Sequence, residues 1–211
     1  MKILDVKDLK IAGVKVIRYA RFTDHRGFFA EHCRKSDFVK HPQLSFFKDI
    51  EFLQNNESYS KPGTVRGLHF QWNPYMGKLI RAMRGRMVDL VLDIRKGSPS
   101  FGKIIGYDMP AGNEDDFGEW IWVPPGFAHG NYFTEDTHIE YFCSGEWSPA
   151  CEAGISPLAG DIDWSLCDRR IKKEFDAIVS ANPLMTEKDR NGFSLSSWAR
   201  NPDSEQFVFK S

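Results

Sequence analysis

The sequence has no long hydrophobic run and no excess of charge of either sign. No stretch approaches the roughly 20 apolar residues that cross a bilayer, and residues 1–5 lack the apolar core of a signal peptide. Lys and Arg total 28 and Asp and Glu total 29, which gives a net charge of −1. Nothing therefore indicates binding to nucleic acid or to a membrane, and we expect a cytoplasmic protein.

Cysteine pairs and phosphate-binding loops are missing as well. The four cysteines, Cys33, Cys143, Cys151 and Cys167, form no Cys-x-x-Cys pair, so scattered thiols are expected rather than a disulfide framework. The chain has neither a Gly-x-Gly-x-x-Gly motif nor a P-loop. The sequence therefore does not indicate a dinucleotide cofactor.

Many short strands with turn residues between them indicate an antiparallel sandwich or barrel. The clearest strand has Val88, Leu90, Leu92 and Ile94 in alternation with other residues, and further strands are expected at 102–109, 120–123 and 139–143. With 211 residues, the chain is expected to form one domain, 1–211.

Two short helices are expected outside these strands. Ser36 is expected to cap a single helical turn that ends near Pro42. Asp168 is expected to cap a helix whose apolar face includes Ile171, Phe175, Ile178 and Val179, and Pro183 would end it. Residues 50–54 lead into the polar stretch 55–58.

Two segments match the two-part signature of cupin barrels. In 63–71, His69 and Gln71 lie two residues apart in strand-like sequence, so both side chains are expected on one face. In 124–129, a proline turn precedes His129. Metal-binding cupins usually carry a second histidine where this chain has Gln71, and one imidazole with an amide is a poor ligand set for a transition metal. No metal is expected.

Several longer motifs share one order with a known family. The chain resembles the deoxysugar epimerase family typified by dTDP-4-dehydrorhamnose 3,5-epimerase over roughly residues 15 to 165, through the motifs at 24–31, 63–71, 77–81, 93–102 and 125–130. The resemblance implies an all-β, cupin-type jelly-roll barrel, an antiparallel double sheet with a few short helices mainly near the C-terminus. It also implies a homodimer, with residues 1–60 in the dimer contact, and a helical or extended segment at 165–211.

The implied reaction needs no cofactor. Family members epimerise a nucleotide-diphosphate 4-keto-6-deoxysugar, whose C4 ketone acidifies the hydrogens on C3 and C5. By resemblance, His69 is the base, Asp189 orients it, Lys78 stabilises the enolate and Tyr141 donates a proton on the opposite face. Two of these residues also have plain structural readings: Thr186-x-x-Asp189 fits a helix-start box, and Tyr141 could be one more aromatic residue in a strand.

The resemblance also implies a set of substrate-binding positions, of which Phe29 and Glu31 would serve the neighbouring subunit's site. These positions are Arg26, Phe29, Glu31, Gln54, Asn56, Arg66, Gln71, His129, Glu146, Glu152 and Lys188. The chain departs from the family at Glu146-Trp147, where members commonly carry two tyrosines, and in a longer loop at 112–118.

Three other functions stay open at this point. A nucleotide-sugar 3,4-ketoisomerase would move the carbonyl instead of inverting a carbon, and analysis of the product would identify it. A metal-dependent cupin oxygenase would contain stoichiometric metal. A non-catalytic binder of sugar nucleotides would bind ligand without exchanging its protons.

Overall fold

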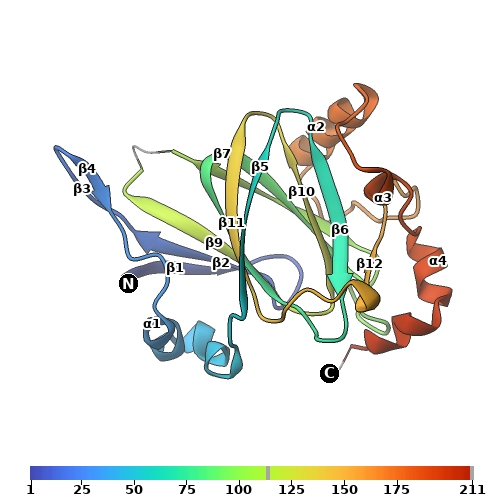
Figure 1. The fold of residues 1–211 in the computed structure, drawn as a ribbon, viewed down its shortest axis with the longest axis horizontal. Helices are drawn as coiled ribbons and strands as arrows, with labels where there is room; N and C mark the ends of the chain where they lie inside the picture. Colours follow the sequence, from blue (N-terminus) through green and yellow to red (C-terminus); the bar gives the residue numbers. More distant parts are fainter. Residues whose placement is uncertain (113–114, 210–211) are drawn as a thin grey trace.

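The computed structural model describes residues 1–112 and 115–209. Its strands pair antiparallel and its helices are short, as expected from the sequence (Figure 1). The strands are β1 (Ile3–Asp8), β2 (Lys15–Ala20), β3 (Phe22–Asp24), β4 (Gly27–Phe29), β5 (Gln54–Ser60), β6 (Val65–Gln71), β7 (Lys78–Asp93), β8 (Ile104–Ala111), β9 (Phe117–Val123), β10 (Phe127–Phe133), β11 (Thr137–Cys143) and β12 (Glu152–Gly154). The helices are α1 (Lys35–Lys40), α2 (Arg169–Ser180), α3 (Glu187–Arg190) and α4 (Leu195–Arg200), with 3-10 helices η1 (Pro42–Asp49), η2 (Pro149–Cys151) and η3 (Pro202–Gln206).

The long strand β7 belongs to both of the packed sheets. One sheet has the order β5-β11-β7-β9-β2-β1, and the other has the order β12-β6-β10-β7-β8. β7 pairs with β11 up to Arg84 and with β8 from Gly85 onward. Gly85 has φ +83°, and a Cβ there would lie 2.3 Å from the carbonyl oxygen of Asp136, so this crossing point needs a glycine.

The alternation in β7 separates two cores. Val88, Leu90 and Leu92 pack against the C-terminal helices, in a cluster that also contains Phe175 and Trp198. The intervening residues face the space between the two sheets. Because helices cover the outer side, both faces of β7 are buried from Met87 to Asp93, and Asp89 and Asp93 are buried with them.

A third core covers the outer face of the other sheet. Phe38 of α1 and Leu44 and Phe47 of η1 pack on Trp120 and Trp122 of β9. The molecule is thus built in layers: α1 and η1, the β5-to-β1 sheet, the β12-to-β8 sheet, and the C-terminal helices (Figure 1).

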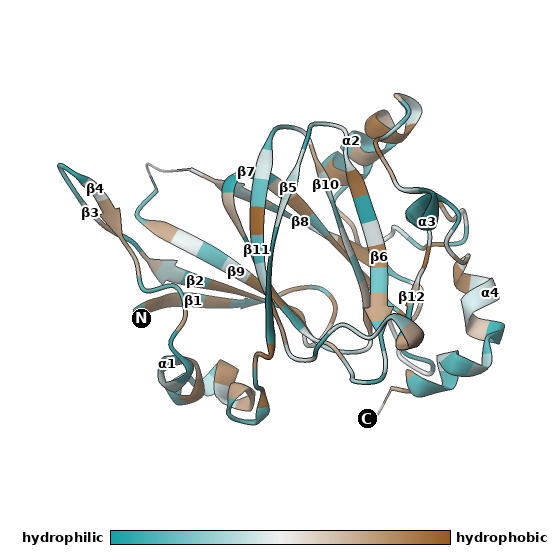
Figure 2. Cartoon of the chain, in the orientation of Figure 1, coloured by the Kyte–Doolittle hydropathy of each residue, from teal (hydrophilic) through white to brown (hydrophobic). Residues whose placement is uncertain are grey.

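The helix expected near residue 170 is confirmed. α2 begins after Asp168, whose carboxylate accepts a hydrogen bond from the backbone N–H of Arg170 at 2.7 Å. Ile171 and Phe175 are buried, and Figure 2 shows hydrophobic and hydrophilic residues on different parts of this helix. These apolar residues pack the helix against the sheet.

One local expectation is wrong, and one strand was not predicted. α1 begins at Lys35, so Ser36 lies inside the helix and does not cap it. Pro42 lies just after the end of α1 and is the first residue of η1. The polar stretch 55–58 lies within strand β5, where the side chains alternate between more and less exposed positions against β11. The longer loop expected at 112–118 includes residues 113 and 114, which lie outside the described residues.

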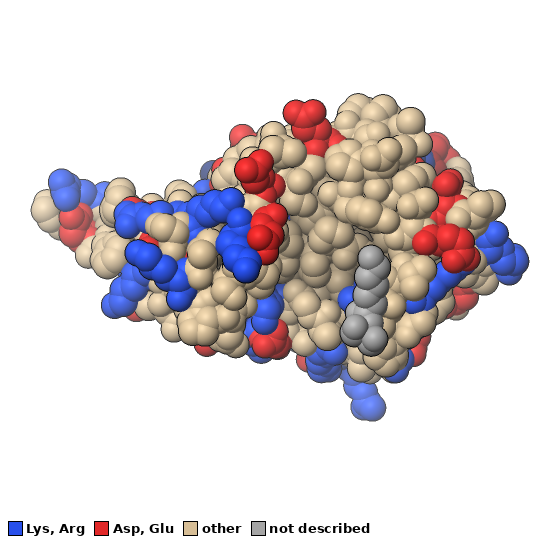
Figure 3. Space-filling model, turned by 90° about the horizontal axis from the view of Figure 1, so that it is seen from below, with Lys and Arg blue, Asp and Glu red and all other residues tan. Residues whose placement is uncertain are grey.

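The surface charge is mixed and unevenly spread. Seen from below, Lys and Arg gather next to the end that carries the β3–β4 hairpin, whereas much of the remaining face is uncharged (Figure 3). In the part of the chain that the structure describes, no helix is both long enough and apolar enough to cross a membrane.

Candidate active site

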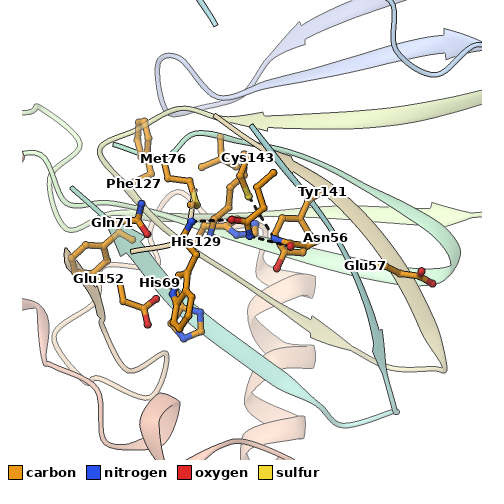
Figure 4. Close-up of a pocket in the computed structure, with 15 residues that line it drawn as sticks. Asn56, Glu57, His69, Gln71, Met76, Phe127, His129, Tyr141, Cys143 and Glu152 are labelled. Atoms are coloured by element: carbon orange, nitrogen blue, oxygen red, sulfur yellow. Dashed lines mark hydrogen bonds between the residues drawn. The ribbon is translucent and has the colours of Figure 1, made fainter. Parts of the chain in front are cut away.

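A cavity of about 470 Å³ opens between the two sheets, and its polar lining comes from both (Figure 4). His69 and Gln71 of β6 both line it, as their spacing in a strand predicts. β10 lies antiparallel to β6, with His129 directly opposite His69. The other polar residues of the lining are Gln54, Asn56, Glu57, Lys78, Tyr141 and Glu152.

An adjoining cavity of about 290 Å³ shares part of this lining. His69, Lys78, His129 and Tyr141 line both spaces, and the second space adds Arg66, Lys188 and Asp189. The four shared side chains come from β6, β7, β10 and β11, so they mark the centre of one site. All four belong to the set expected from the sequence.

His69 and Asp189 form a hydrogen-bonded pair across 120 positions of sequence. Nε2 of His69 lies 2.6 Å from Oδ1 of Asp189, and the aspartate side chain is 5% exposed. Burial opposes ionisation of Asp189, but its interactions with His69, the backbone of Gly67 and Thr186 together keep the pKa of the carboxyl below its ordinary value. Asp189 is therefore a carboxylate beside the imidazole.

The helix-start reading of Thr186-x-x-Asp189 is confirmed, and the same aspartate contacts His69. The hydroxyl of Thr186 accepts a hydrogen bond from the backbone N–H of Asp189 at 3.2 Å, which caps α3. The side chain of the same Asp189 bonds to His69. The cap thus fixes the backbone from which the carboxylate reaches the site.

Lys78 and Tyr141 are half-buried groups whose ionisation the site disfavours. Burial lowers the pKa of Lys78, against the nearby carboxylates of Asp89 and Glu152. Burial also raises the pKa of Tyr141, which keeps the phenol protonated. A partly desolvated ammonium group can stabilise negative charge that develops on a ligand, and a protonated phenol can donate a hydrogen bond or a proton to it.

A second histidine–aspartate pair lies behind the first, and sequence reasoning missed its acid. Nε2 of His129 lies 2.6 Å from Oδ1 of Asp89, which also accepts from Asn131 at 3.2 Å. Burial lowers the pKa of His129, although Asp89 raises it. Within the described residues, Oδ2 of Asp89 has no hydrogen-bond partner. The sequence does contain a sign of this pair, because an aspartate between valine and leucine in an apolar strand needs a polar partner if it is buried.

The predicted binding residues divide into two groups. Gln54, Asn56, Gln71 and Glu152 line the larger cavity, and Arg66 and Lys188 line the smaller one. Lys188 forms an ion pair with Glu152, which joins α3 to β12 beside the His69–Asp189 pair. Glu146 is exposed on the segment that follows β11.

Arg26, Phe29 and Glu31 lie elsewhere. Arg26 is at the turn of the β3–β4 hairpin, paired with Asp24 at 2.7 Å, and its side chain is 78% exposed. Phe29 and Glu31 line a separate surface hollow with Trp120. The single chain, as far as it is described, does not bring these three residues together with His69.

The described residues contain no group of three or more His, Cys, Asp or Glu side chains placed to bind a metal ion. Where metal-binding cupins usually carry a second histidine, Gln71 is 4% exposed and its amide bonds to the backbone of two loops. The donor set around His69 therefore does not resemble a transition-metal site.

Comparison with known proteins identifies the family. The family model described as dTDP-4-dehydrorhamnose 3,5-epimerase matches residues 8–197. The chain belongs to this family. A dTDP-4-dehydrorhamnose 3,5-epimerase of Shigella flexneri is 35% identical over 191 residues, covering 90% of this chain and 94% of the relative. One from Sinorhizobium fredii is 38% identical over 187 residues, covering 86% and 89%.

A solved structure gives the same result for the fold. The crystal structure of dTDP-6-deoxy-D-glucose-3,5-epimerase from Legionella pneumophila, in complex with dTDP-4-keto-L-rhamnose, has a TM-score of 0.78. It is 27% identical and covers 98% of each chain. The family, the cupin-type jelly roll and the enzyme class, an epimerase of carbohydrate derivatives, are therefore confirmed as the sequence predicted.

Proposed function

We propose that this epimerase inverts C3, C5 or both of a nucleotide-linked 4-keto-6-deoxysugar, with His69 as the base. The observation that carries the proposal is the His69–Asp189 pair at 2.6 Å, on the wall of a cavity that Lys78 and Tyr141 also line. The Legionella relative is described in complex with a dTDP-linked 4-keto sugar. The polar cavity between the sheets has the volume expected of a ligand site.

In the proposed first step, His69 removes a proton from a carbon next to the ketone. A proton on Nε2 that is shared with Asp189 leaves the lone pair on Nδ1 to act as the base. The electron pair of the broken C–H bond moves to the ketone oxygen and forms an enolate. Positioned proton transfer of this kind contributes about 10²–10⁴-fold to a rate.

Lys78 and Tyr141 would act on the enolate. The Lys78 ammonium would stabilise the oxygen, which is worth most in a site with little water. Tyr141 projects from β11 while His69 projects from β6, so the two approach the cavity from different strands (Figure 4). With its phenol kept protonated by burial, Tyr141 would return a proton to the carbon on the face opposite His69. No oxidation or reduction occurs, so the proposed reaction requires no cofactor.

The test is incubation in D₂O with 4-keto-6-deoxysugars linked to dTDP, UDP, GDP or CDP, followed by NMR of the products. We expect deuterium at C3, C5 or both, with inversion at the labelled carbon, for one of the four nucleotides. A product with its carbonyl at C3 would identify a ketoisomerase instead. Binding without deuterium incorporation for any nucleotide would refute catalysis.

We also propose that two copies form a homodimer through the N-terminal 60 residues. The β3–β4 hairpin projects from the body of the molecule (Figure 1), and its apolar side chains are exposed, with Phe22, Phe28 and Phe29 at 52%, 41% and 65%. A hairpin of this kind could carry Arg26, Phe29 and Glu31 to the site of a second copy. A reducing, cytoplasmic location fits the four free cysteines of the described chain.

Mixing two inactive variants tests this shared site. Arg26→Ala and His69→Ala would each lose activity, but a mixed dimer would contain one site with both residues intact. We expect activity to return to about a quarter of the wild-type value after random exchange of equal amounts of subunits. Mixtures that stay inactive would contradict the shared site, and a monomer by light scattering at micromolar concentration would contradict the dimer.

A further inference from the structure

The buried amide of Gln71 is fully engaged with backbone groups. Its Nε2 donates to the carbonyl oxygens of Pro74 and Glu146, both at 2.9 Å, and its Oε1 accepts from the backbone N–H of Ser148 at 2.7 Å. Both N–H groups of the amide are therefore used. The bonds to Glu146 and Ser148 lie on either side of Trp147, so one side chain fastens the backbone around this residue.

Trp147 itself is fastened by a second glutamine. Oε1 of Gln54 accepts from the backbone N–H of Trp147 at 2.8 Å, and Nε2 of Gln54 donates to Asn56 at 3.0 Å. Residues 146–148 lie in neither a helix nor a strand. Side chains from β5 and β6 thus supply the hydrogen bonds that a strand partner would otherwise supply.

The fastened segment places an exposed aromatic side chain at the cavity. Trp147 is 58% exposed, yet it lines the larger cavity together with His69 and Glu152. An apolar ring held in a polar cavity offers a flat contact surface to a ligand. Because its backbone is already ordered, a ligand that contacts the ring pays less to order the segment on binding.

We infer that Gln71 is a positioning residue that holds Trp147 as a wall of the substrate cavity and thereby sets how tightly the nucleotide sugar binds. The inference rests on the proposed function. It gives Gln71 a role different from that of a metal ligand or of a residue that bonds to substrate. Metal-binding cupins have a histidine at this position. The amide of Gln71 bonds to three backbone groups at once, which the two ring nitrogens of an imidazole could not do.

Amide hydrogen exchange tests the fastening without any catalysis. Gln71→Met keeps the length of the side chain and removes its polar atoms. We expect the amide of Ser148 to exchange at least tenfold faster in this variant. Gln54→Met is the matched control, in which the amide of Trp147 should lose protection while Ser148 stays protected. Unchanged exchange at Ser148 in Gln71→Met would overturn the inference.

Binding and kinetics test the consequence. Calorimetry with dTDP as the probe, or with whichever of UDP, GDP and CDP the wild type binds, should give a Kd about tenfold higher for Gln71→Met. The KM for the matching 4-keto sugar should rise by a larger factor than kcat falls. Trp147→Ala should show the same change, and the double variant should be no worse than Trp147→Ala alone. Additive losses, or a fall in kcat at constant KM, would show that Gln71 acts independently of Trp147.

Two further outcomes have distinct meanings. Should Gln71→Met fail to fold, Gln71→Asn replaces it, because the shorter amide cannot reach Pro74, Glu146 and Ser148 together. Unchanged exchange at Ser148 with an unchanged Kd in that variant would overturn the inference. A wild-type protein that binds the nucleotide without epimerising the sugar would refute the proposed reaction, while the exchange and binding results would still decide the role of Gln71.

Discussion

Substitution of Asp189 by asparagine isolates the charge beside His69. Asparagine has nearly the same shape, and its amide oxygen can still accept from Nε2 across the present 2.6 Å. The cap of α3 should survive as well, because it uses the backbone N–H of Asp189 and the hydroxyl of Thr186. The substitution therefore removes a negative charge and little else.

The expected loss follows from what the charge does during the reaction. When His69 takes a proton it becomes an imidazolium, and a carboxylate at hydrogen-bond distance stabilises that cation. A hydrogen bond to a charged group is worth about 1.5–3 kcal/mol. Because Asp189 is 5% exposed, water does not replace this contribution effectively. At about 1.4 kcal/mol per factor of ten, the rate of proton abstraction should fall by about 10- to 150-fold.

The assay is the rate of deuterium incorporation from D₂O, measured by NMR on the 4-keto sugar. We expect kcat to fall while KM stays close to the wild-type value, because the carboxylate contacts the base and not the sugar in the proposed reaction. Thr186→Ala is the matched control. It removes the cap of α3, at a cost of about 1 kcal/mol of stability, and leaves the charge in place. Its exchange rate should fall less than that of Asp189→Asn.

Exchange by Asp189→Asn within twofold of the wild-type rate would refute this reasoning. A loss in Thr186→Ala as large as that in Asp189→Asn would also refute it, since α3 would then contribute through its position alone. Thermal unfolding of both variants separates these results from a general loss of folding.

The remaining predictions concern four other parts of the chain. His69→Ala should abolish deuterium incorporation at both C3 and C5, and exchange at the wild-type rate would remove it from the role of base. Tyr141→Phe should retain exchange and lose inversion at C5, as product NMR would show. Burial holds the pKa of His129 below that of an unfolded histidine, about 6.5, so below that pH the unfolded chain binds a proton that the folded chain does not. The free energy of unfolding should therefore fall as the pH falls, by up to about 1.4 kcal/mol per unit for this group, and His129→Gln should reduce the slope in urea titrations. Gly67→Ala should unfold at lower urea than Gly63→Ala, because both lie at positive φ but only the Cβ at 67 would meet backbone, 2.6 Å from the Cα of Gly130, whereas none of the described atoms lies within 4 Å at 63.

Patterns within single segments predicted much of the fold. Alternation located the second half of β7, short apolar segments located β9 and β11, and a capping aspartate with an apolar stripe located α2. Those signals arise from the packing of apolar side chains, which each segment records in its own residues. Strand β5 was not predicted because residues 55–58 are polar, and the segment is a strand only through its pairing with β11. No periodicity within the segment reports that partner.

The site was predictable where a residue type and a family motif coincide. His69, Lys78 and Tyr141 meet at one cavity, as the resemblance implied. Asp89 was missed because its partner, His129, lies on another strand, and an aspartate in an alternating strand looks like a solvated residue. The alternation predicted the strand, but it could not show that helices bury one face of residues 87–93 and the second sheet buries the other.

One residue can order the local backbone and also lie at the cavity. Thr186 and Asp189 satisfy a helix-start pattern through backbone and hydroxyl, which leaves the carboxylate of Asp189 free to bond to His69. Gln71 likewise satisfies backbone groups while its strand position holds it two residues from His69. In both cases a residue that bonds to a loop or a helix start also lies at the cavity. Capping and fastening residues next to a cavity are therefore candidates for positioning roles, and substitutions that separate the two uses decide between them.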